Sequence, residues 1–262
     1  MKSINKSSSV NTSIATLKSY FFLALLLGSG VMLAQQKEYK IPPEATEVWE
    51  PEPRVVQSGE TMNTPPSDAI VLFDGKHADE WTKPDGSPVG WTIEDGALVV
   101  KPGAGSIMTR RKFGDIQLHI EFRTPAKVES EGQGRGNSGV FLQQRYEVQV
   151  LDSYQNRTYS NGQASSIYKQ NPPLVNASRG PGEWQTYDII FTAPRFNADG
   201  HRISPGYVTV LHNGVLTQHH TQIQGTTEYI GWPKNIAHGP DGIQLQDHGN
   251  FTAFRNIWVR EL

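Results

Sequence analysis

The chain contains no cysteine among its 262 residues. A structural disulfide, a cysteine nucleophile and a zinc site with cysteine ligands are therefore excluded. An acyl anchor of the lipoprotein type is excluded as well, because it requires a cysteine at the cleavage point. If the protein is exported, its packed core alone must stabilise it.

Long apolar runs are scarce, and the longest spans residues 20–33, about 14 residues, which is short for a membrane span. Three lysines precede this run, and the small residue Ala34 follows it. The pattern predicts a signal peptide over residues 1–36 and export to the periplasm or the medium, not as a lipoprotein. Retention of the segment as an anchor is the alternative. After cleavage, we expect no stable membrane insertion.

An excess of positive charge is also missing. The leader holds three of the 24 basic residues, so residues 37–262 keep 21 basic against 26 acidic residues, a net charge of −5. Phosphate binding requires a basic surface, so the charge argues against a nucleic-acid partner.

Proline is concentrated early in the chain. Residues 37–67 are predicted to form an extended arm, because they hold the prolines at positions 42, 43, 51, 53, 65 and 66. Residues 68–262 are predicted to form one domain.

No helical period longer than two turns is present in that domain, and strand patterns dominate it. Residues 116–123 alternate, with Ile116, Leu118, Ile120 and Phe122 predicted to face inward. Asp95-Gly96 and Asn213-Gly214 each separate two apolar runs and predict tight hairpins. The sequence therefore predicts an all-β jelly-roll sandwich of two antiparallel sheets with a concave groove.

The segment 136–152 is the most informative for function. Tyr146, Val148 and Val150 alternate with Glu147 and Gln149, so one face of this strand is polar. Together with Arg145 and Asp152, these polar residues would suit a ligand that carries many hydroxyl groups. The alternative is a solvated strand face on which Glu147 pairs with Arg145 or Arg123.

A second candidate group is Asp247-His248-Gly249. His248 is the best candidate for a general base, and Gln246 shares its parity along the strand. If the strand is regular, Asp247 faces the other way and only one of the two enters the groove. The alternative is a turn in which Asp247 caps backbone groups and Gly249 takes a positive φ.

Other candidates lie in or beside segment 153–182, a loop long enough to suggest a function. Lys169 could contact hydroxyl groups or an enolate, and Tyr168 and Trp184 could stack on a sugar, although Trp184 would equally suit the core. A divalent cation such as Ca, Mn or Zn is left open, with Glu147, Asp152, Asp247 and His248 as candidate ligands. No ligand spacing among them is diagnostic.

The ordered motifs resemble one family, the bacterial 3-keto-disaccharide hydrolases, or 3-keto-glucoside 1,2-lyases. The resemblance covers about residues 69–262 and rests on Leu72-Phe-Asp-Gly-Lys76, Gly136-Asn-Ser-Gly139, Tyr146-Glu-Val-Gln-Val-Leu-Asp152, Gln244-Leu-Gln-Asp-His-Gly249 and Phe254-Arg-Asn-Ile257. It implies a concanavalin A-like fold and a keto-sugar or oligosaccharide substrate. It also implies removal of the C2 proton, elimination of the C1 substituent and rehydration.

In that chemistry His248 would be the base, and Glu147 and Asp152 would act as acid, second base or metal ligands. Substrate contacts are expected from Arg145, Gln149, Tyr168, Lys169, Trp184 and Gln246. Two alternatives from the residues stay open. One is a hydrolase of unmodified polysaccharide, which Gln149 between the carboxylates weakens. The other is a non-catalytic carbohydrate-binding module.

Overall fold

The computed structural model describes residues 40–262, which divide into two units at Pro53. The described part of the first unit contains one 3-10 turn, η1 (Pro43–Thr46), and its residues are exposed. The second unit, residues 54–262, holds all the strands. The predicted signal peptide, residues 1–36, lies outside the described residues. Residues 54–67 of the predicted arm belong to the second unit, where Arg54 pairs with Asp68 over 2.9 Å.

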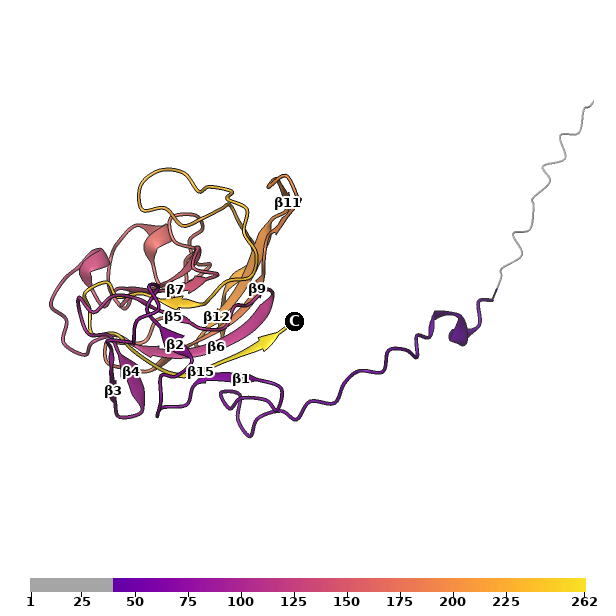
Figure 1. Ribbon diagram of the computed structural model, residues 1–262, viewed down its shortest axis with the longest axis horizontal. Coiled ribbons are helices and arrows are strands. Elements are labelled where there is room, and N and C mark those ends of the chain that lie inside the picture. The colour runs from indigo at the N-terminus through magenta and orange to yellow at the C-terminus, as the bar shows by residue number, and fades with distance from the viewer. Residues whose placement is uncertain (1–39) are drawn as a thin grey trace, which may run out of the picture. The chain divides into compact units, whose positions relative to one another are not determined.

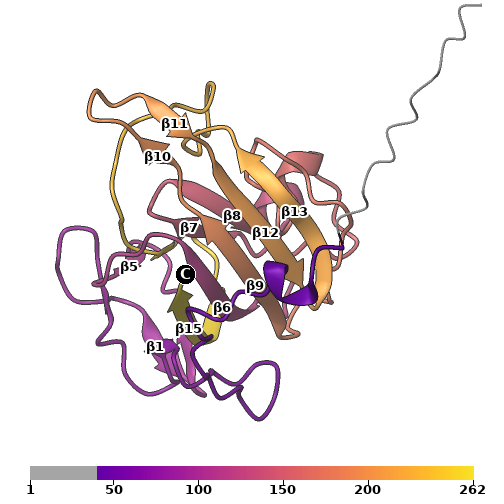
Figure 2. The ribbon, with the colours of Figure 1, turned by 90° about the vertical axis from the view of Figure 1, so that its right-hand side faces the viewer.

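The larger sheet of the second unit has eight strands, and all its neighbours are antiparallel. Its order is β13-β12-β9-β6-β15-β4-β3, and β1 pairs with β15. The central strands run side by side in Figure 2. The strands are β1 (Ile70–Phe73), β3 (Thr92–Glu94), β4 (Ala97–Val99), β6 (Ile116–Arg123), β9 (Gln185–Thr192), β12 (Gly206–His212), β13 (Val215–Ile223) and β15 (Ala253–Glu261).

The smaller sheet has five antiparallel strands in the order β2-β5-β14-β7-β8. Figure 1 shows strands of the two sheets in separate layers. The strands are β2 (Trp81–Thr82), β5 (Ile107–Thr109), β7 (Ser138–Leu142), β8 (Tyr146–Val150) and β14 (Gln244–Leu245). A separate two-stranded ribbon joins β10 (Arg195–Phe196) to β11 (Arg202–Ser204), and two short 3-10 turns are η2 (Gly132–Gly134) and η3 (Ser160–Gly162).

The core lies between the two sheets. Ile120 and Phe122 of the larger sheet, and Val140 and Val148 of the smaller one, are completely buried in one apolar cluster. Burial of such side chains stabilises the fold by about 1.5–3 kcal/mol each. The structure therefore confirms the predicted all-β jelly-roll sandwich of two antiparallel sheets.

The local predictions for the strands also hold in most details. Asp95-Gly96 connects β3 to β4, and Asn213-Gly214 connects β12 to β13, as predicted. His119 and Glu121 alternate with the core residues Ile120 and Phe122 along β6, and both are nevertheless buried. The ring of Trp258 on β15 stacks on His119, and Asn256 donates to Glu121, so a second layer of side chains covers this face.

Within residues 40–262, no helix is long and apolar enough to cross a bilayer.

Candidate active site

Strand β8 carries the central residues of the site. Its apolar side chains, Tyr146, Val148 and Val150, belong to the core between the sheets. Because successive side chains in a strand point to opposite faces, Glu147 and Gln149 lie on the outer face of the smaller sheet. Both nevertheless are almost completely buried, at 4% and 0% exposed. The alternation predicted from the sequence is confirmed, but the polar face is a covered pocket wall and not a solvated surface.

The neighbouring strand β7 makes room for the Glu147 carboxyl group. Gly139 pairs with Gln149 and Phe141 pairs with Glu147 across the two strands. A Cβ atom at residue 139 would fall 2.5 Å from Glu147 Oε1, which is too close for two such atoms. Only glycine at this position therefore leaves the space that the carboxyl group occupies.

The chain beyond β14 brings an imidazole to the same pocket. Gln246 and His248 line it, while Asp247 points away and accepts hydrogen bonds from the backbone N–H groups of Gly105 and Gly249, both 2.9 Å long. Gly249 takes a φ of +80°. The two alternatives predicted for this segment are therefore both present. Asp247 caps a turn, and His248 in this turn lines the pocket.

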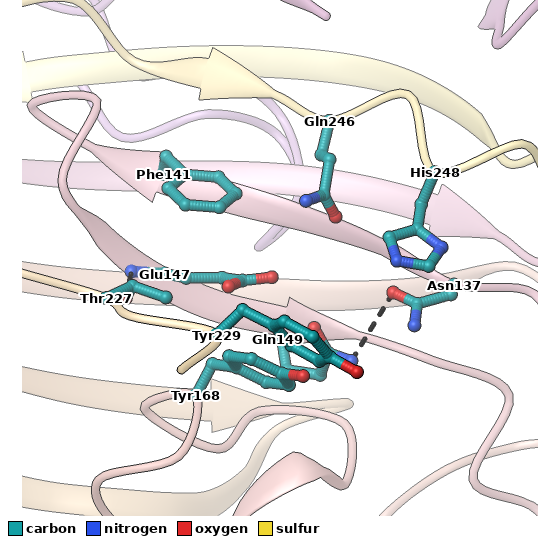
Figure 3. Close-up of a pocket in the computed structure, with 9 residues that line it drawn as sticks. All are labelled: Asn137, Phe141, Glu147, Gln149, Tyr168, Thr227, Tyr229, Gln246 and His248. Carbon is teal, nitrogen blue, oxygen red and sulfur yellow. Dashed lines mark hydrogen bonds between the residues drawn. The ribbon is translucent and has the colours of Figure 1, made fainter. Parts of the chain in front are cut away.

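Two loops cover the pocket. The loop between β8 and β9 supplies Tyr168, whose hydroxyl group lies 2.6 Å from that of Tyr159. The loop between β13 and β14 supplies Thr227 and Tyr229, and Thr227 Oγ1 accepts a hydrogen bond from the backbone N–H of Glu147. The pocket has a volume of about 260 Å³ (Figure 3), and its lining residues are Asn137, Phe141, Glu147, Gln149, Tyr168, Thr227, Tyr229, Gln246 and His248.

Burial changes the acidity of Glu147. No ion pair to Glu147 forms among the described residues, and removal from water raises its pKa to about 8. The Gln149 amide lies beside it: with its nitrogen toward Glu147, it donates to Oε1 over 2.9 Å. With its oxygen toward Glu147, the Gln149 amide instead accepts a hydrogen bond from the protonated carboxyl group. This amide can therefore serve both protonation states of the carboxyl group.

Gln246 provides an unused polar atom. Its side-chain oxygen is buried and has no hydrogen-bond partner among the described residues. Figure 3 shows this side chain directed into the pocket between Phe141 and His248. A buried polar atom without a partner is costly, so a substrate hydroxyl group would satisfy it.

Two predicted site residues lie elsewhere. Asp152 accepts a hydrogen bond from Arg135 Nε over 2.6 Å. It lines a separate pocket, which Arg135 and Asn250 also line. Arg145 lies in the turn before β8, and its guanidinium binds Asp241 over 2.8 Å. In both cases an oppositely charged partner holds the side chain away from the Glu147 pocket, and for Arg145 this partner lies 96 residues further along the chain. The structure therefore does not bring Asp152 or Arg145 into this site.

Trp184 and Lys169 are also outside the pocket. The Trp184 ring is covered by two guanidinium groups, with Arg255 Cζ 4.0 Å and Arg123 Cζ 4.8 Å from its centroid. This ring therefore makes cation–π contacts and is not a free sugar platform. Lys169 lies next to the pocket, with its Nζ 4.3 Å from the centroid of Tyr229.

The four candidate metal ligands do not converge. Across residues 40–262, no three histidine, aspartate or glutamate side chains come together as a metal site requires. Glu147 and His248 line one pocket, Asp247 is engaged with backbone N–H groups, and Asp152 with Arg135. The residues present do not fit a divalent cation held by this set.

Sequence reasoning missed Asn137, Phe141, Thr227 and Tyr229. The strand pattern identifies Phe141, because it shares the parity of Gly139 along β7. Strand β7 pairs with β8, which carries the candidate Glu147. Thr227 and Tyr229 lie in a loop without periodicity, about 80 residues after β8, so no local pattern connects them with Glu147.

The pocket combines aromatic walls with a few convergent polar groups, as the binding sites of small molecules usually do. The comparison with known families agrees: residues 68–260 match the 3-keto-alpha-glucoside-1,2-lyase-like domain. The chain belongs to this family. The resemblance found in the sequence motifs is thereby confirmed, and membership supports cleavage of a glycosidic bond.

Two solved structures are also similar to this chain. A provisionally named glycosyl hydrolase from Parabacteroides distasonis ATCC 8503 is 51% identical, with a TM-score of 0.81 over 85% of this chain and 97% of that chain. A second such protein from the same organism is 23% identical, with a TM-score of 0.52 over 74% of this chain and 99% of that chain. This second likeness shows the fold alone. A search of the curated proteins found no match.

Proposed function

We propose that the protein cleaves 3-keto-glycosides by elimination. A ketone at C3 acidifies the proton on C2, so a base in the pocket can remove it and leave an enolate. Collapse of the enolate forms the C1–C2 double bond and breaks the bond from C1 to the leaving oxygen. That oxygen takes a proton from an acid. Addition of water to the unsaturated product would complete a net hydrolysis.

The buried carboxyl group of Glu147 carries this proposal. Its pKa of about 8 keeps it protonated at neutral pH, so it can deliver a proton to the leaving oxygen. Among residues 40–262, no other carboxylate lines the pocket. A glycosidase that acts on unmodified sugars usually needs two carboxylates on opposite sides of the bond, and the described residues supply only one here.

We assign the base to His248. Its imidazole lies at the opposite end of the pocket from Glu147 in Figure 3. This arrangement suits an elimination in which the C2 proton and the C1 substituent leave toward different groups. Gln149, Gln246 and Tyr168 would bind the sugar hydroxyl groups and the enolate oxygen, because they add amide and hydroxyl groups to the same pocket.

We also propose that the protein is exported, with residues 1–36 as a cleaved signal peptide. The basic start of the chain, the short apolar run and Ala34 support this proposal. Mass spectrometry of the protein from its native cells would test it. A mature chain that still begins at residue 1 or 2 would contradict it.

The activity is tested with matched substrates. Purified protein is incubated with a 3-keto-α-glucoside and with the same glucoside before oxidation, and release of the aglycone is measured. We expect release from the keto-sugar only. Release from the unoxidised glycoside would support a hydrolase of unmodified sugars, and binding of both without release would support a carbohydrate-binding module. Either result would overturn the proposal.

A further inference from the structure

The side-chain amide of Gln149 is completely buried beside the Glu147 carboxyl group, so its neighbours decide which way the amide points. One end of the amide lies 2.9 Å from Glu147 Oε1. The other end faces Gln133, 3.0 Å away, and Asn137, 3.4 Å away, and the contact with Asn137 is the dashed line in Figure 3. An amide donates from its nitrogen and only accepts at its oxygen, so the two orientations differ chemically.

Gln133 is held in one orientation by a backbone carbonyl group. Its Nε2 atom donates to the carbonyl oxygen of Gly162 over 2.8 Å. That oxygen can only accept, so the Gln133 nitrogen must face it and the Gln133 oxygen must face Gln149. The second partner of Nε2, the Thr158 hydroxyl group 3.1 Å away, can donate or accept and leaves the orientation free. Gly162 therefore decides the orientation of Gln133.

Asn137 adds a second acceptor on the same side. Its Nδ2 atom donates to the backbone oxygen of Gln133 over 2.7 Å, so its Oδ1 atom is left toward Gln149. The 3-10 turn η2, which carries Gln133, is itself fixed. Asn156 donates to the backbone oxygen of Gly132 over 3.0 Å and accepts from its backbone N–H over 2.9 Å. Two fixed acceptors thus face the same end of the Gln149 amide.

These acceptors require the nitrogen of Gln149, so its oxygen is directed toward Glu147. An oxygen there accepts a hydrogen bond from a protonated carboxyl group and repels a carboxylate. The backbone oxygen of Ser138, 3.1 Å from the same end of the amide, opposes this orientation. With Glu147 protonated, Ser138 is one acceptor against two. The chain from Gly162 through Gln133 to Gln149 therefore favours the protonated form of the carboxyl group.

Titratable groups from three other segments also face Glu147. They are Tyr159 and Tyr168 from the loop between β8 and β9, Tyr229 from the loop between β13 and β14, and His248 from the segment after β14. Burial raises the pKa of Tyr159 and Tyr168, so both phenols stay neutral near pH 8. A charged His248, or the Lys169 ammonium group beside the pocket, would favour an ionised Glu147. Wild type and variants share these groups, so a difference between them reports on the amide chain.

We propose that Gln133 is a positioning residue, which acts through Gln149 to keep Glu147 in the acid form that the leaving oxygen requires. The direction of the amide chain does not depend on any reaction, while its use in proton transfer rests on the proposed function. Gln133 does not line the Glu147 pocket, so its effect reaches the substrate through Gln149.

The pKa of Glu147 is measured in the full chain by carboxyl NMR, with the wild type and Gln133→Met compared. Methionine is unbranched and carries no amide, so the Gln149 amide becomes free to turn its nitrogen toward Glu147. We expect the pKa of Glu147 to fall by about one unit, because one hydrogen bond to a buried group is exchanged. An unchanged pKa in Gln133→Met would overturn the inference.

Thr158→Val is the matched control, because it also removes a partner of Gln133 but not the partner that fixes its orientation. The pKa of Glu147 in this variant should match that of the wild type. An equal fall in Thr158→Val and Gln133→Met would mean that any loosening of this region lowers the pKa, and would contradict the specific role of Gln133.

A neutron crystal structure of the wild type at pH 6 gives a test that needs no variant. We expect deuterium on the end of the Gln149 amide that faces Gln133, and on the Glu147 carboxyl group. Deuterium on the end of the amide that faces Glu147 would overturn the inference, even if Gln133→Met fails to fold.

Turnover separates this inference from the proposed function. With a 3-keto-glycoside, the alkaline limb of the kcat/KM profile should move down by about one pH unit in Gln133→Met and stay in place in Thr158→Val. A uniform loss of activity with an unmoved limb would mean that Gln133 is merely structural, and would overturn the positioning role. A lowered pKa of Glu147 in Gln133→Met, with no turnover by any form of the protein, would support the amide chain and refute the proposed function.

Discussion

The carboxyl group of Glu147 occupies the space that Gly139 leaves empty, with the position of a Cβ at residue 139 only 2.5 Å from Glu147 Oε1. A glycine in a central strand weakens that strand, because it adds no packing and loses more entropy on folding. Here it leaves room for an ionisable side chain to lie buried against the face of the sheet. The relationship explains how the Glu147 carboxyl group is held in one place.

Replacement of Gly139 by alanine should therefore disable the site while the protein remains folded. We expect Gly139→Ala to lower turnover of a 3-keto-glycoside about 10²-fold, because the carboxyl group must move by an ångström or more. Gly114→Ala is the control, since a Cβ there meets nothing within 4 Å. Wild-type turnover in Gly139→Ala would show that the position of Glu147 is unimportant for the reaction.

The raised pKa of Glu147 predicts how stability depends on pH. A protonated Glu147 fits the folded state, so its contribution is complete below pH 4.5 and is lost as the pH rises through about 8. Between pH 4.5 and about 8, the free energy of unfolding should fall by on the order of 1.4 kcal/mol for each pH unit. Glu147→Gln should remove this pH dependence. Denaturant unfolding of the variant and the wild type at pH 5 and pH 8.5 measures the free energies of unfolding to be compared. A constant gap between variant and wild type at the two pH values would contradict the assignment.

The same group predicts the alkaline limb of the activity profile. If Glu147 donates the proton to the leaving oxygen, kcat/KM should fall as the pH rises through about 8. Glu147→Gln should abolish this limb together with most of the activity. A substrate whose leaving group needs no protonation, such as a nitrophenol, should recover part of the activity in the variant.

His248 is predicted to be the base. We expect His248→Ala to lower kcat about 10²-fold or more, with a smaller change in KM. Exchange of the C2 proton with deuterated solvent gives a direct readout, because it follows the base alone. His201→Ala is the control, since His201 is an exposed residue that does not line the pocket. Undiminished exchange in His248→Ala would assign the base to another group.

Trp184 should contribute to stability and not to sugar binding. The guanidinium groups of Arg123 and Arg255 both lie over its ring, and Arg255 also pairs with Glu121 over 2.7 Å. Trp184→Ala should lower the free energy of unfolding by about 1 kcal/mol or more. Its affinity for a disaccharide, measured well below the melting temperature, should match that of the wild type. A selective loss of affinity would restore Trp184 to the site.

The buried histidine of the larger sheet predicts a second effect of pH. Burial alone would lower the pKa of His119, but the carboxylates of Asp188, 2.7 Å away, and Glu121 outweigh it and raise the pKa. The pair thus stabilises the fold below pH 6.5 and loses this contribution as the pH rises through the raised pKa. Asp188→Asn should cost about 1 kcal/mol more at pH 5.5 than at pH 9 in denaturant unfolding. An equal cost at both values would mean that His119 is neutral throughout.

Much of the fold could be predicted because its signals are local. The alternation along residues 146–150 requires only that successive side chains in a strand face opposite ways. The hairpins at Asp95-Gly96 and Asn213-Gly214 require only that the turn residues tolerate positive φ, and all four of these residues have φ values between +48° and +77°. The family motifs extend the prediction of the fold to the whole domain.

The membership of the site could be predicted only in part. Glu147, Gln149, Gln246 and His248 meet as expected, because strand parity fixes which of their neighbours point away. Arg145 shares the parity of Glu147 and Asp152 follows the end of the same strand, yet they bind Asp241 and Arg135. The sequence by itself determined which face of each strand is polar. Only the tertiary structure decided which charges are neutralised by distant partners, and which loop closes the pocket, because ion pairing and loop packing depend on contacts between segments far apart in the chain.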